Sequence, residues 1–210
     1  MGDLDKILEG LVEFRQNDFE NHKDLFQDLS KIQKPHTLFI GCSDSRVVPE
    51  MMTKSLPGEL FMVRNVANLV PRFRLTQEYV ATTSAIEYAV QILDIKNIIV
   101  CGHSNCGGCA ALYFTDEQMK KIPNTKKWLE LAAPIKARVL NQVPDNNPQA
   151  REWLTEQMNI VEQLKNLLTY PYILERVEAG TLTIHGWYYI IETGEVFSYD
   201  RNMGYFEKLN

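Results

Sequence analysis

Two short segments of the chain carry residue types that bind transition metals. The first contains Cys42, Asp44 and Arg46, and the second contains His103 and Cys106. Thiolates and imidazole are good ligands for zinc, and a carboxylate oxygen is a further candidate. The C-x-D and H-x-x-C spacings let each pair reach one ion from a single turn. Because three protein ligands with one replaceable position form a catalytic site, these residues predict a catalytic zinc centre.

Asp44 is the ambiguous member of this set. It either completes a closed site of four protein ligands or leaves the fourth position to water. Arg46 follows two residues later, and arginine can hold a carboxylate through a charge-assisted, often bidentate, hydrogen bond. That bond would keep Asp44 ionised and off the metal, as an acceptor for the proton of a metal-bound hydroxide. An oriented hydroxide is what attack on a small electrophile requires.

The two segments each follow an apolar run that is typical of a buried parallel strand. Residues 37–40 precede Cys42, residues 97–100 precede His103, and a third such run covers residues 60–63. In open α/β sheets, ligands bind at the carboxyl ends of the strands. We therefore expect both segments to face one crevice, although some sixty residues separate them.

The other predicted elements complete an α/β fold, with a mainly parallel β-sheet flanked by helices. Between the second and third strands, residues 76–93 are predicted to be helical, with Val80, Ser84, Tyr88 and Ile92 on one face. The further predictions are an N-terminal helical arm (3–16 and 18–32), helices at 125–142 and 148–169 joined near Pro144 and Pro148, and an edge hairpin (181–190 and 196–199). One domain is expected over residues 1–210, with the arm at 1–33 and the α/β core at 34–210.

Composition excludes several classes of protein. The 210 residues carry a net charge of −5 with no Lys/Arg block, which argues against nucleic acid and anionic membranes as partners. No apolar run approaches the roughly 18 residues of a membrane span, and the first residues lack a signal-peptide pattern. The expected location is the cytoplasm, where the four cysteines are metal ligands, nucleophiles or core residues and not disulfides.

The two segments resemble the signature motifs of the β-class carbonic anhydrases. The resemblance extends over residues 30–200 and is carried by stretches 42–46, 57–61, 64–68, 85–90, 101–108 and 166–171. It implies a lyase of the plant-like, open-site type, which hydrates CO2 reversibly to bicarbonate and a proton through a zinc-bound hydroxide. It also implies one zinc ion per chain, bound by Cys42, His103 and Cys106, and an Asp44–Arg46 dyad.

The same resemblance implies a pocket for the substrate pair CO2 and bicarbonate. Its residues would be Gln33, Phe61, Val66 and Tyr88, some of them from a partner subunit, and the backbone N–H of Gly107 would add a donor. The family forms obligate dimers that can pair into tetramers, so a homodimer or homotetramer is implied. The amphipathic arm is then expected to pack on a neighbouring subunit.

Alternatives remain at this stage. Asp44 could permanently close a non-catalytic zinc site of four protein ligands. The same fold could also act on a CO2 analogue such as carbonyl sulfide or carbon disulfide. A regulatory bicarbonate site, present in some family members, needs a Trp where this chain has Phe39, which favours the open-site type. Cys106 and Cys109 form a Cys-x-x-Cys pattern, but a redox pair would leave His103 unexplained, so Cys109 is expected to pack on a helix.

Overall fold

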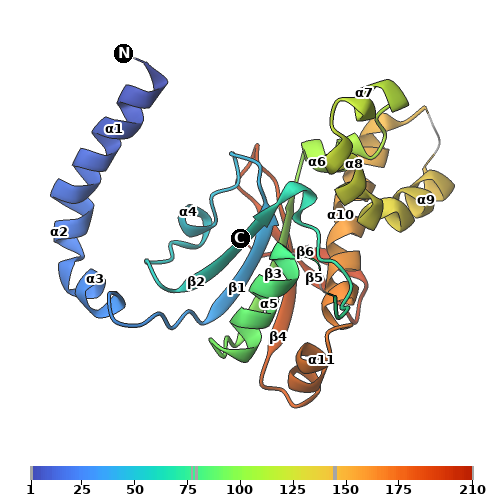
Figure 1. Cartoon of the computed structure of the whole chain (residues 1–210). Helices are drawn as coiled ribbons and strands as arrows, with labels where there is room; N and C mark the ends of the chain where they lie inside the picture. Colours follow the sequence, from blue (N-terminus) through green and yellow to red (C-terminus); the bar gives the residue numbers. More distant parts are fainter. Residues whose placement is uncertain (1, 77, 79, 144–145, 210) are drawn as a thin grey trace.

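The centre of the molecule is a mixed β-sheet. The computed structural model describes residues 2–76, 78, 80–143 and 146–209. Within these residues the chain forms a six-stranded sheet in the order β2-β1-β3-β4-β5-β6, parallel from β2 to β4 and antiparallel from β4 to β6 (Figure 1). The strands are β1 (Thr37–Cys42), β2 (Leu60–Asn65), β3 (Asn97–His103), β4 (Thr183–Tyr189), β5 (Val196–Asp200) and β6 (Tyr205–Lys208). The predicted α/β class with a mainly parallel sheet is confirmed.

Helices flank the sheet, and a helical arm precedes it (Figure 1). The arm contains α1 (Asp3–Glu13), a π-helical turn (Phe14–Asp18), α2 (Phe19–Asn21) and α3 (Lys23–Leu29). The later helices are α4 (Pro49–Thr53), α5 (Ala81–Gln91), α6 (Gly107–Ala111), α7 (Asp116–Lys120), α8 (Pro123–Leu129), α9 (Ala133–Gln142), α10 (Pro148–Leu167) and α11 (Pro171–Glu178). None of the helices described is both long enough and apolar enough to cross a bilayer.

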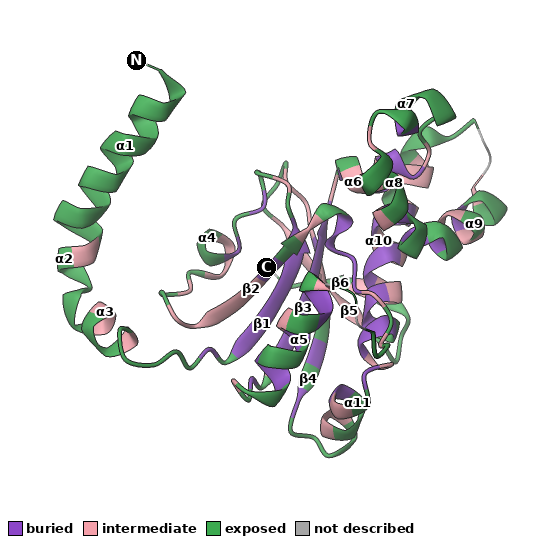
Figure 2. Ribbon diagram, in the orientation of Figure 1, coloured by how far each residue is buried: buried purple, intermediate pink, exposed green. Residues whose placement is uncertain are grey.

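The core fills both faces of the central strands, which are the most continuously buried part of the chain (Figure 2). On one face, Leu38 and Ile40 of β1 join a cluster with residues of α5 and α10. On the other, Phe39 packs with Ile99 and Cys101. Strands buried on both faces read as continuous apolar runs, which explains why they were recognisable from the sequence.

Helix α10 lies unusually close to the sheet. A Cβ atom at Gly102 of β3 would be 2.7 Å from Ile160 Cγ1, and one at Gly186 of β4 would be 2.8 Å from Ile160 Cγ2. Both glycines therefore let the helix approach the strands directly. This contact places the preceding turn of α10, which contains Glu156, beside the end of β3 and the loop that follows it.

The prediction of a helix from residue 76 was wrong at its start. The helix begins at Ala81, because the Thr76 hydroxyl accepts a hydrogen bond from the Glu78 N–H and forms a side-chain turn instead. Residues 77 and 79 lie outside the described residues. The predicted face through Tyr88 exists but is exposed, whereas Ile86 and Ala89 face the core.

Two further boundaries differ from the predictions. The helix expected at 125–142 is divided by a 3-10 turn at Glu130–Ala132, because Pro134 has no N–H to continue the first helix. The joint expected at Pro144 lies outside the described residues, and α10 begins at Pro148 as predicted. The predicted C-terminal hairpin is present, but the short strand β6 lies beyond it and forms the edge of the sheet.

The helical arm extends away from the sheet (Figure 1), and almost all of it is exposed (Figure 2). Its own small core consists of Phe19 stacked on Phe26 at 5.2 Å, with Phe14 at the edge of Phe26. The exposed apolar residues of α1 are Leu4, Ile7, Leu8, Leu11 and Val12. An amphipathic helix gains stability only when such a face is covered, and no described element covers this one.

Candidate metal centre

Adjacent strand ends bring the two predicted segments together. Strands β1 and β3 pair in parallel, so Cys42 and His103 leave the sheet at the same edge. A tight turn with Asn105 in the left-handed region, at φ 54°, then returns Cys106 to the same point. Sulfur and nitrogen atoms of Cys42, His103 and Cys106 all lie within 4.8 Å of one another, and all three residues are buried.

The His103 ring is oriented for a metal. Its Nδ1 lies 3.0 Å from the Ser104 carbonyl oxygen, so Nδ1 carries the proton and donates it. The lone pair is then on Nε2, which is buried without a hydrogen-bond partner in the described part of the chain. A buried nitrogen with no partner is costly unless it has a ligand. This is the arrangement in which an outer hydrogen bond fixes the tautomer of a metal-binding histidine.

The two thiols are close enough to resist ionisation in the absence of a cation. The Cys42 and Cys106 sulfurs lie 3.9 Å apart. Their hydrogen bond, together with burial, raises the pKa of Cys42 to about 12. Contact with Cys109 and burial raise the pKa of Cys106 as well. A divalent cation between the sulfurs would reverse this preference, so the donor set of two sulfurs and one nitrogen fits zinc.

Arg46 holds the Asp44 carboxylate next to this group. Asp44 Oδ1 accepts from Arg46 Nε at 2.9 Å and from the Arg46 backbone N–H at 3.0 Å, while Oδ2 accepts from Nη2 at 2.7 Å. This bidentate contact keeps the pKa of Asp44 well below its usual range. Nη2 also donates to the Asn105 carbonyl at 2.9 Å, so Arg46 connects both ligand loops. Asp44 Oδ2 lies 3.9 Å from His103 Nε2.

A second arginine braces the first ligand loop. Arg64 Nε donates to the Cys42 carbonyl at 3.0 Å, and its Nη2 donates to the Asp44 carbonyl at 2.6 Å. Because the guanidinium spans these two carbonyls, it restrains the backbone on either side of the first loop. From the sequence, Arg64 was placed only in the 64–68 stretch and, through the family resemblance, as the arginine that a regulatory bicarbonate site would also need; this bracing contact was not predicted.

Glu156 of α10 is a site residue that the sequence reasoning missed. Its Oε1 accepts from the Cys106 backbone N–H at 2.8 Å, and its Oε2 accepts from the Tyr188 hydroxyl at 2.6 Å. Burial raises the pKa of Glu156 to about 7 against these two donors. The sequence did contain a signal for Glu156, because it is an acidic residue on the core-facing side of a predicted helix. Buried carboxylates are rare unless they are paired, so such a residue is expected to have a specific partner.

Comparison with known proteins identifies the family. The sequence profile of the carbonic anhydrase family matches residues 37–196. The chain belongs to the carbonic anhydrase family. It is 43% identical over 203 residues to a carbonic anhydrase of Helicobacter pylori (strain J99), which covers 95% of this chain and 92% of the relative.

Solved structures place this family member in the β class. It matches the β-carbonic anhydrase CcaA with a TM-score of 0.92 at 38% identity, over 99% of this chain and 100% of that one. It also matches a tetrameric β-carbonic anhydrase of the ascomycete Sordaria macrospora. The TM-score is 0.78 at 30% identity, over 93% of this chain and 95% of that one.

The pocket residues predicted for this family member fall into two groups. Gly107 is the first residue of α6, directly after Cys106, and a first-turn N–H has no partner within its helix. Val66 adjoins the same turn, because its Cγ1 would be 3.0 Å from a Cβ at Gly108. These two residues therefore lie beside the three predicted metal ligands of the same chain.

The remaining predicted pocket residues lie far from the three predicted metal ligands of their own chain. Phe61 pairs with Leu38, four strand positions before Cys42, which is about 13 Å along β1. Tyr88 packs on Phe61, with ring centroids 6.1 Å apart. Gln33 precedes β1 at the opposite end from Cys42. One copy of the chain does not bring these three residues to its own metal centre.

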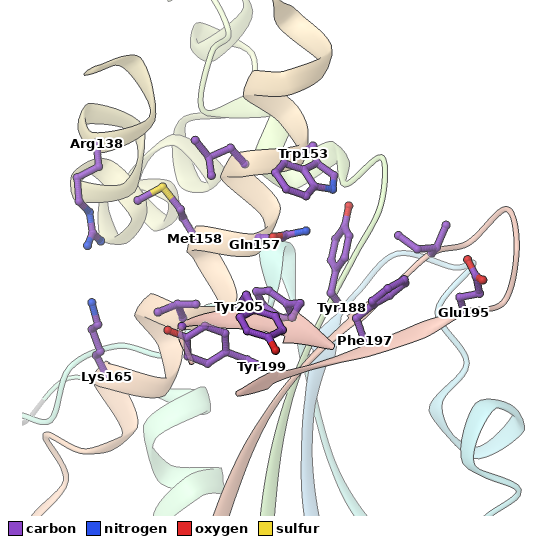
Figure 3. A pocket seen from close by; sticks show the side chains of 15 residues that line it. Arg138, Trp153, Gln157, Met158, Lys165, Tyr188, Glu195, Phe197, Tyr199 and Tyr205 are labelled. Carbon is purple, nitrogen blue, oxygen red and sulfur yellow. The ribbon is translucent and has the colours of Figure 1, made fainter. Parts of the chain in front are cut away.

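A separate groove of about 670 Å³ opens between α10 and the strands β5 and β6 (Figure 3). Its walls combine aromatic side chains, among them Trp153, Phe197 and Tyr205, with aliphatic and polar ones. None of the predicted site residues lines it. Tyr188 lies in its wall, but the hydroxyl of that residue is bonded to Glu156.

Proposed function

We propose that this chain catalyses the reversible hydration of CO2 to bicarbonate and a proton at one zinc ion per chain. The observation that supports the zinc site best is the buried group of Cys42, His103 and Cys106, in which His103 Nε2 has a free lone pair and no described partner. When bound, zinc would supply Lewis acidity that lowers the pKa of a water molecule far below its value in bulk water, although less than at a three-histidine site, because two thiolates neutralise the dication.

The side chains around the three ligands have complementary roles in this proposal. Asp44, ionised and held by Arg46, accepts a hydrogen bond from the reacting water and fixes its orientation. The Gly107 N–H donates to an oxygen of the bicarbonate product. Val66 provides an apolar wall for CO2, which is small and uncharged.

We further propose that the site is of the open type. All three hydrogen bonds from Arg46 to Asp44 draw the carboxylate toward the arginine, and this favours three protein ligands. The closed alternative has one observation in its favour, the 3.9 Å distance between Asp44 Oδ2 and His103 Nε2. X-ray absorption of the zinc protein at pH 8.5 would distinguish the open site from the closed one. An open site would have two sulfurs, one nitrogen and an exchangeable oxygen, whereas in a closed site the oxygen would belong to Asp44.

A homo-oligomer follows from the position of the pocket residues. The pocket of a second copy would be completed by Gln33, Phe61 and Tyr88. The apolar face of the arm (residues 1–33) would be covered by packing on that copy. Residues 34–210 would form a single core domain. The tetrameric Sordaria macrospora relatives support a dimer or a dimer of dimers. The four free cysteines suit a reducing compartment, so we place the protein in the cytoplasm.

The test is stopped-flow CO2 hydration by the zinc-loaded protein. We expect hydration well above the spontaneous rate, and its loss in Cys106→Ser, which removes one of the two thiolates. A zinc-loaded wild type that leaves CO2 to equilibrate at the uncatalysed rate across the pH range would falsify the proposal. Zinc content is measured on both proteins, so that an unloaded sample is not mistaken for an inactive one.

A further inference from the structure

The loop after β2 has an unusual backbone conformation beside the metal centre. Ala67 and Asn68 both lie in the left-handed region, at φ 64° and 45°. A non-glycine residue rarely adopts this conformation, and it persists only where the surroundings hold it in place. The loop packs against the turn after Cys106, because a Cβ at Gly108 would be 2.9 Å from the Ala67 nitrogen.

Polar side chains, and not neighbouring strands, satisfy the backbone of this loop. Asn159 Nδ2 donates to the Ala67 carbonyl at 2.8 Å, and Trp128 Nε1 donates to the Val66 carbonyl at 2.9 Å. Further along, the Val70 N–H donates to Gln163 Oε1 at 2.8 Å, and Asn166 Nδ2 donates to the Val70 carbonyl at 2.9 Å. Buried backbone groups need such partners, so the side chains determine the path of the loop.

Four of the polar residues on α10 form one buried stripe, which we call the α10 polar stripe. Its members are Glu156, Asn159, Gln163 and Asn166, spaced along one helical face and all at most 5% exposed. Glu156 bonds the Cys106 N–H, whereas the other three bond the loop after β2. One rigid helix face thus holds both the ligand turn and the loop that carries Val66.

Asn159 occupies the central place in this stripe. Its Nδ2 also lies 3.8 Å from Cys109 Sγ, on the helix that begins after Cys106, and its Oδ1 accepts from Gln163 Nε2 at 2.7 Å. Both hydrogen-bonding atoms of the amide are therefore used. The hydrogen bonds described for Asn159 go to Ala67, Cys109 and Gln163 and to none of the three predicted metal ligands, so we expect its effect to be on the loop and not on metal binding.

We propose that Asn159 is a positioning residue that keeps Ala67 left-handed and thereby holds Val66 against the Cys106–Gly107 turn as a wall of the substrate pocket. The proposal rests on the proposed function, because Val66 is a pocket residue only if the site takes CO2. Removing the amide releases the strained loop, and Val66 then moves away from Gly108.

The kinetic test compares Asn159→Ala with Asn166→Ala in the zinc-loaded protein. Each variant removes one buried amide that donates to a loop carbonyl, so losses of stability are similar. We expect Asn159→Ala to raise the KM for CO2 about tenfold, with kcat and zinc content changed less than about twofold. In the wild type, Asn166 bonds Val70, which is further from the site, so we expect Asn166→Ala to leave KM close to the wild-type value.

A rescue variant distinguishes positioning from general destabilisation. Ala67→Gly removes the cost of the left-handed conformation, because glycine adopts positive φ freely. In the Asn159→Ala background, it should return KM to within about threefold of wild type. An unchanged KM in Asn159→Ala, an equal rise in Asn166→Ala, or no rescue by Ala67→Gly would each overturn the proposal.

A crystal structure of Asn159→Ala tests the inference independently of activity. We expect Ala67 to leave the left-handed region and Val66 to separate from Gly108. If Ala67 keeps its φ and Val66 its contact, Asn159 does not position the loop. An inactive wild type contradicts the proposed function alone, since the loop conformation is still measured.

Discussion

Arg46 holds the carboxylate of Asp44, which lies two residues earlier in the sequence, and we propose that this contact keeps Asp44 off the metal. The carboxylate lies close enough to His103 to compete for a metal, yet three hydrogen bonds from Arg46 hold it in place. The arginine also bonds Asn105 in the second loop. The charge of one side chain thus controls both the ionisation of Asp44 and the alignment of the two loops.

Replacing Arg46 tests this control. Arg46→Leu frees the Asp44 carboxylate, which then competes for the metal, and we expect kcat/KM for CO2 hydration to fall about 30-fold or more. Arg46→Lys keeps the charge but not the bidentate contact, and its loss should be smaller. X-ray absorption should show a fourth protein ligand in Arg46→Leu. Full activity in that variant would mean that Asp44 needs no such restraint.

The pKa values of the thiols predict how metal binding depends on pH. The hydrogen bond to Cys106 and burial raise the pKa of Cys42 to about 12, and the pKa of Cys106 is also raised, so we expect both thiols to be protonated at neutral pH before a metal binds. Both protons must leave when a dication binds. Zinc affinity should therefore rise about 100-fold per pH unit between pH 7 and 9. Competition with a chelator measures the slope, and in Cys42→Ser it should fall to about tenfold per unit.

At the level of elements, α10 has the central role. It lies on two glycines of the sheet, and its polar stripe bonds both the ligand turn and the loop after β2. The helix was recognisable from its spacing, but the inward direction of its polar residues was not. Periodicity identifies a buried face by its apolar residues, and buried polar residues on the same face do not add to that pattern.

The glycine at β4 can be tested as a packing site. Gly186→Ala would place a methyl group 2.8 Å from Ile160 and 2.9 Å from Leu164, which forces α10 away from the sheet. We expect the free energy of unfolding in urea to fall by about 1–3 kcal/mol. The same change at Gly10 in α1, where nothing lies within 4 Å, should not lower it and should raise it by up to about 1 kcal/mol, because alanine favours the helix. Equal stability of the two variants would show that α10 tolerates the shift.

At the level of the whole molecule, the proposed function needs a second copy of the chain. Phe61 and Tyr88 pack together away from the metal ligands, and the apolar face of α1 is exposed. Under the proposed function, a second copy receives the arm and supplies Phe61 and Tyr88 as part of the pocket wall. The acidic side chains of α1 make an anionic membrane an unsuitable alternative partner.

Charging the apolar face of the arm should separate the subunits. With Ile7→Asp and Leu11→Asp combined, we expect the molar mass in solution to fall from that of a dimer or tetramer toward 24.2 kDa. CO2 hydration should fall with it, because each pocket then lacks the residues of its partner. Glu9→Gln, on the same helix, is the control. A monomeric wild type, measured by light scattering, would contradict the model of a shared pocket.

The sequence alone determined the residue types of the metal centre and the strands that carry them. Apolar runs ending in Cys42 and His103 predicted buried parallel strands, and the C-x-D-x-R and H-x-x-C spacings predicted ligands at their ends. These features are local, since a strand is defined by consecutive residues and a turn by its spacing. They therefore remain visible without knowledge of the fold.

Tertiary structure alone decided how the centre is held. The bonds from Arg64, Glu156 and Asn159 to ligand and pocket loops join residues 20 to 92 positions apart, and no local pattern encodes them. The start of α5 and the division at Pro134 also depended on side-chain hydrogen bonds and steric limits that averaged periodicity does not detect. Long-range partners are fixed only when the helices and the sheet pack, because packing determines which buried polar groups meet.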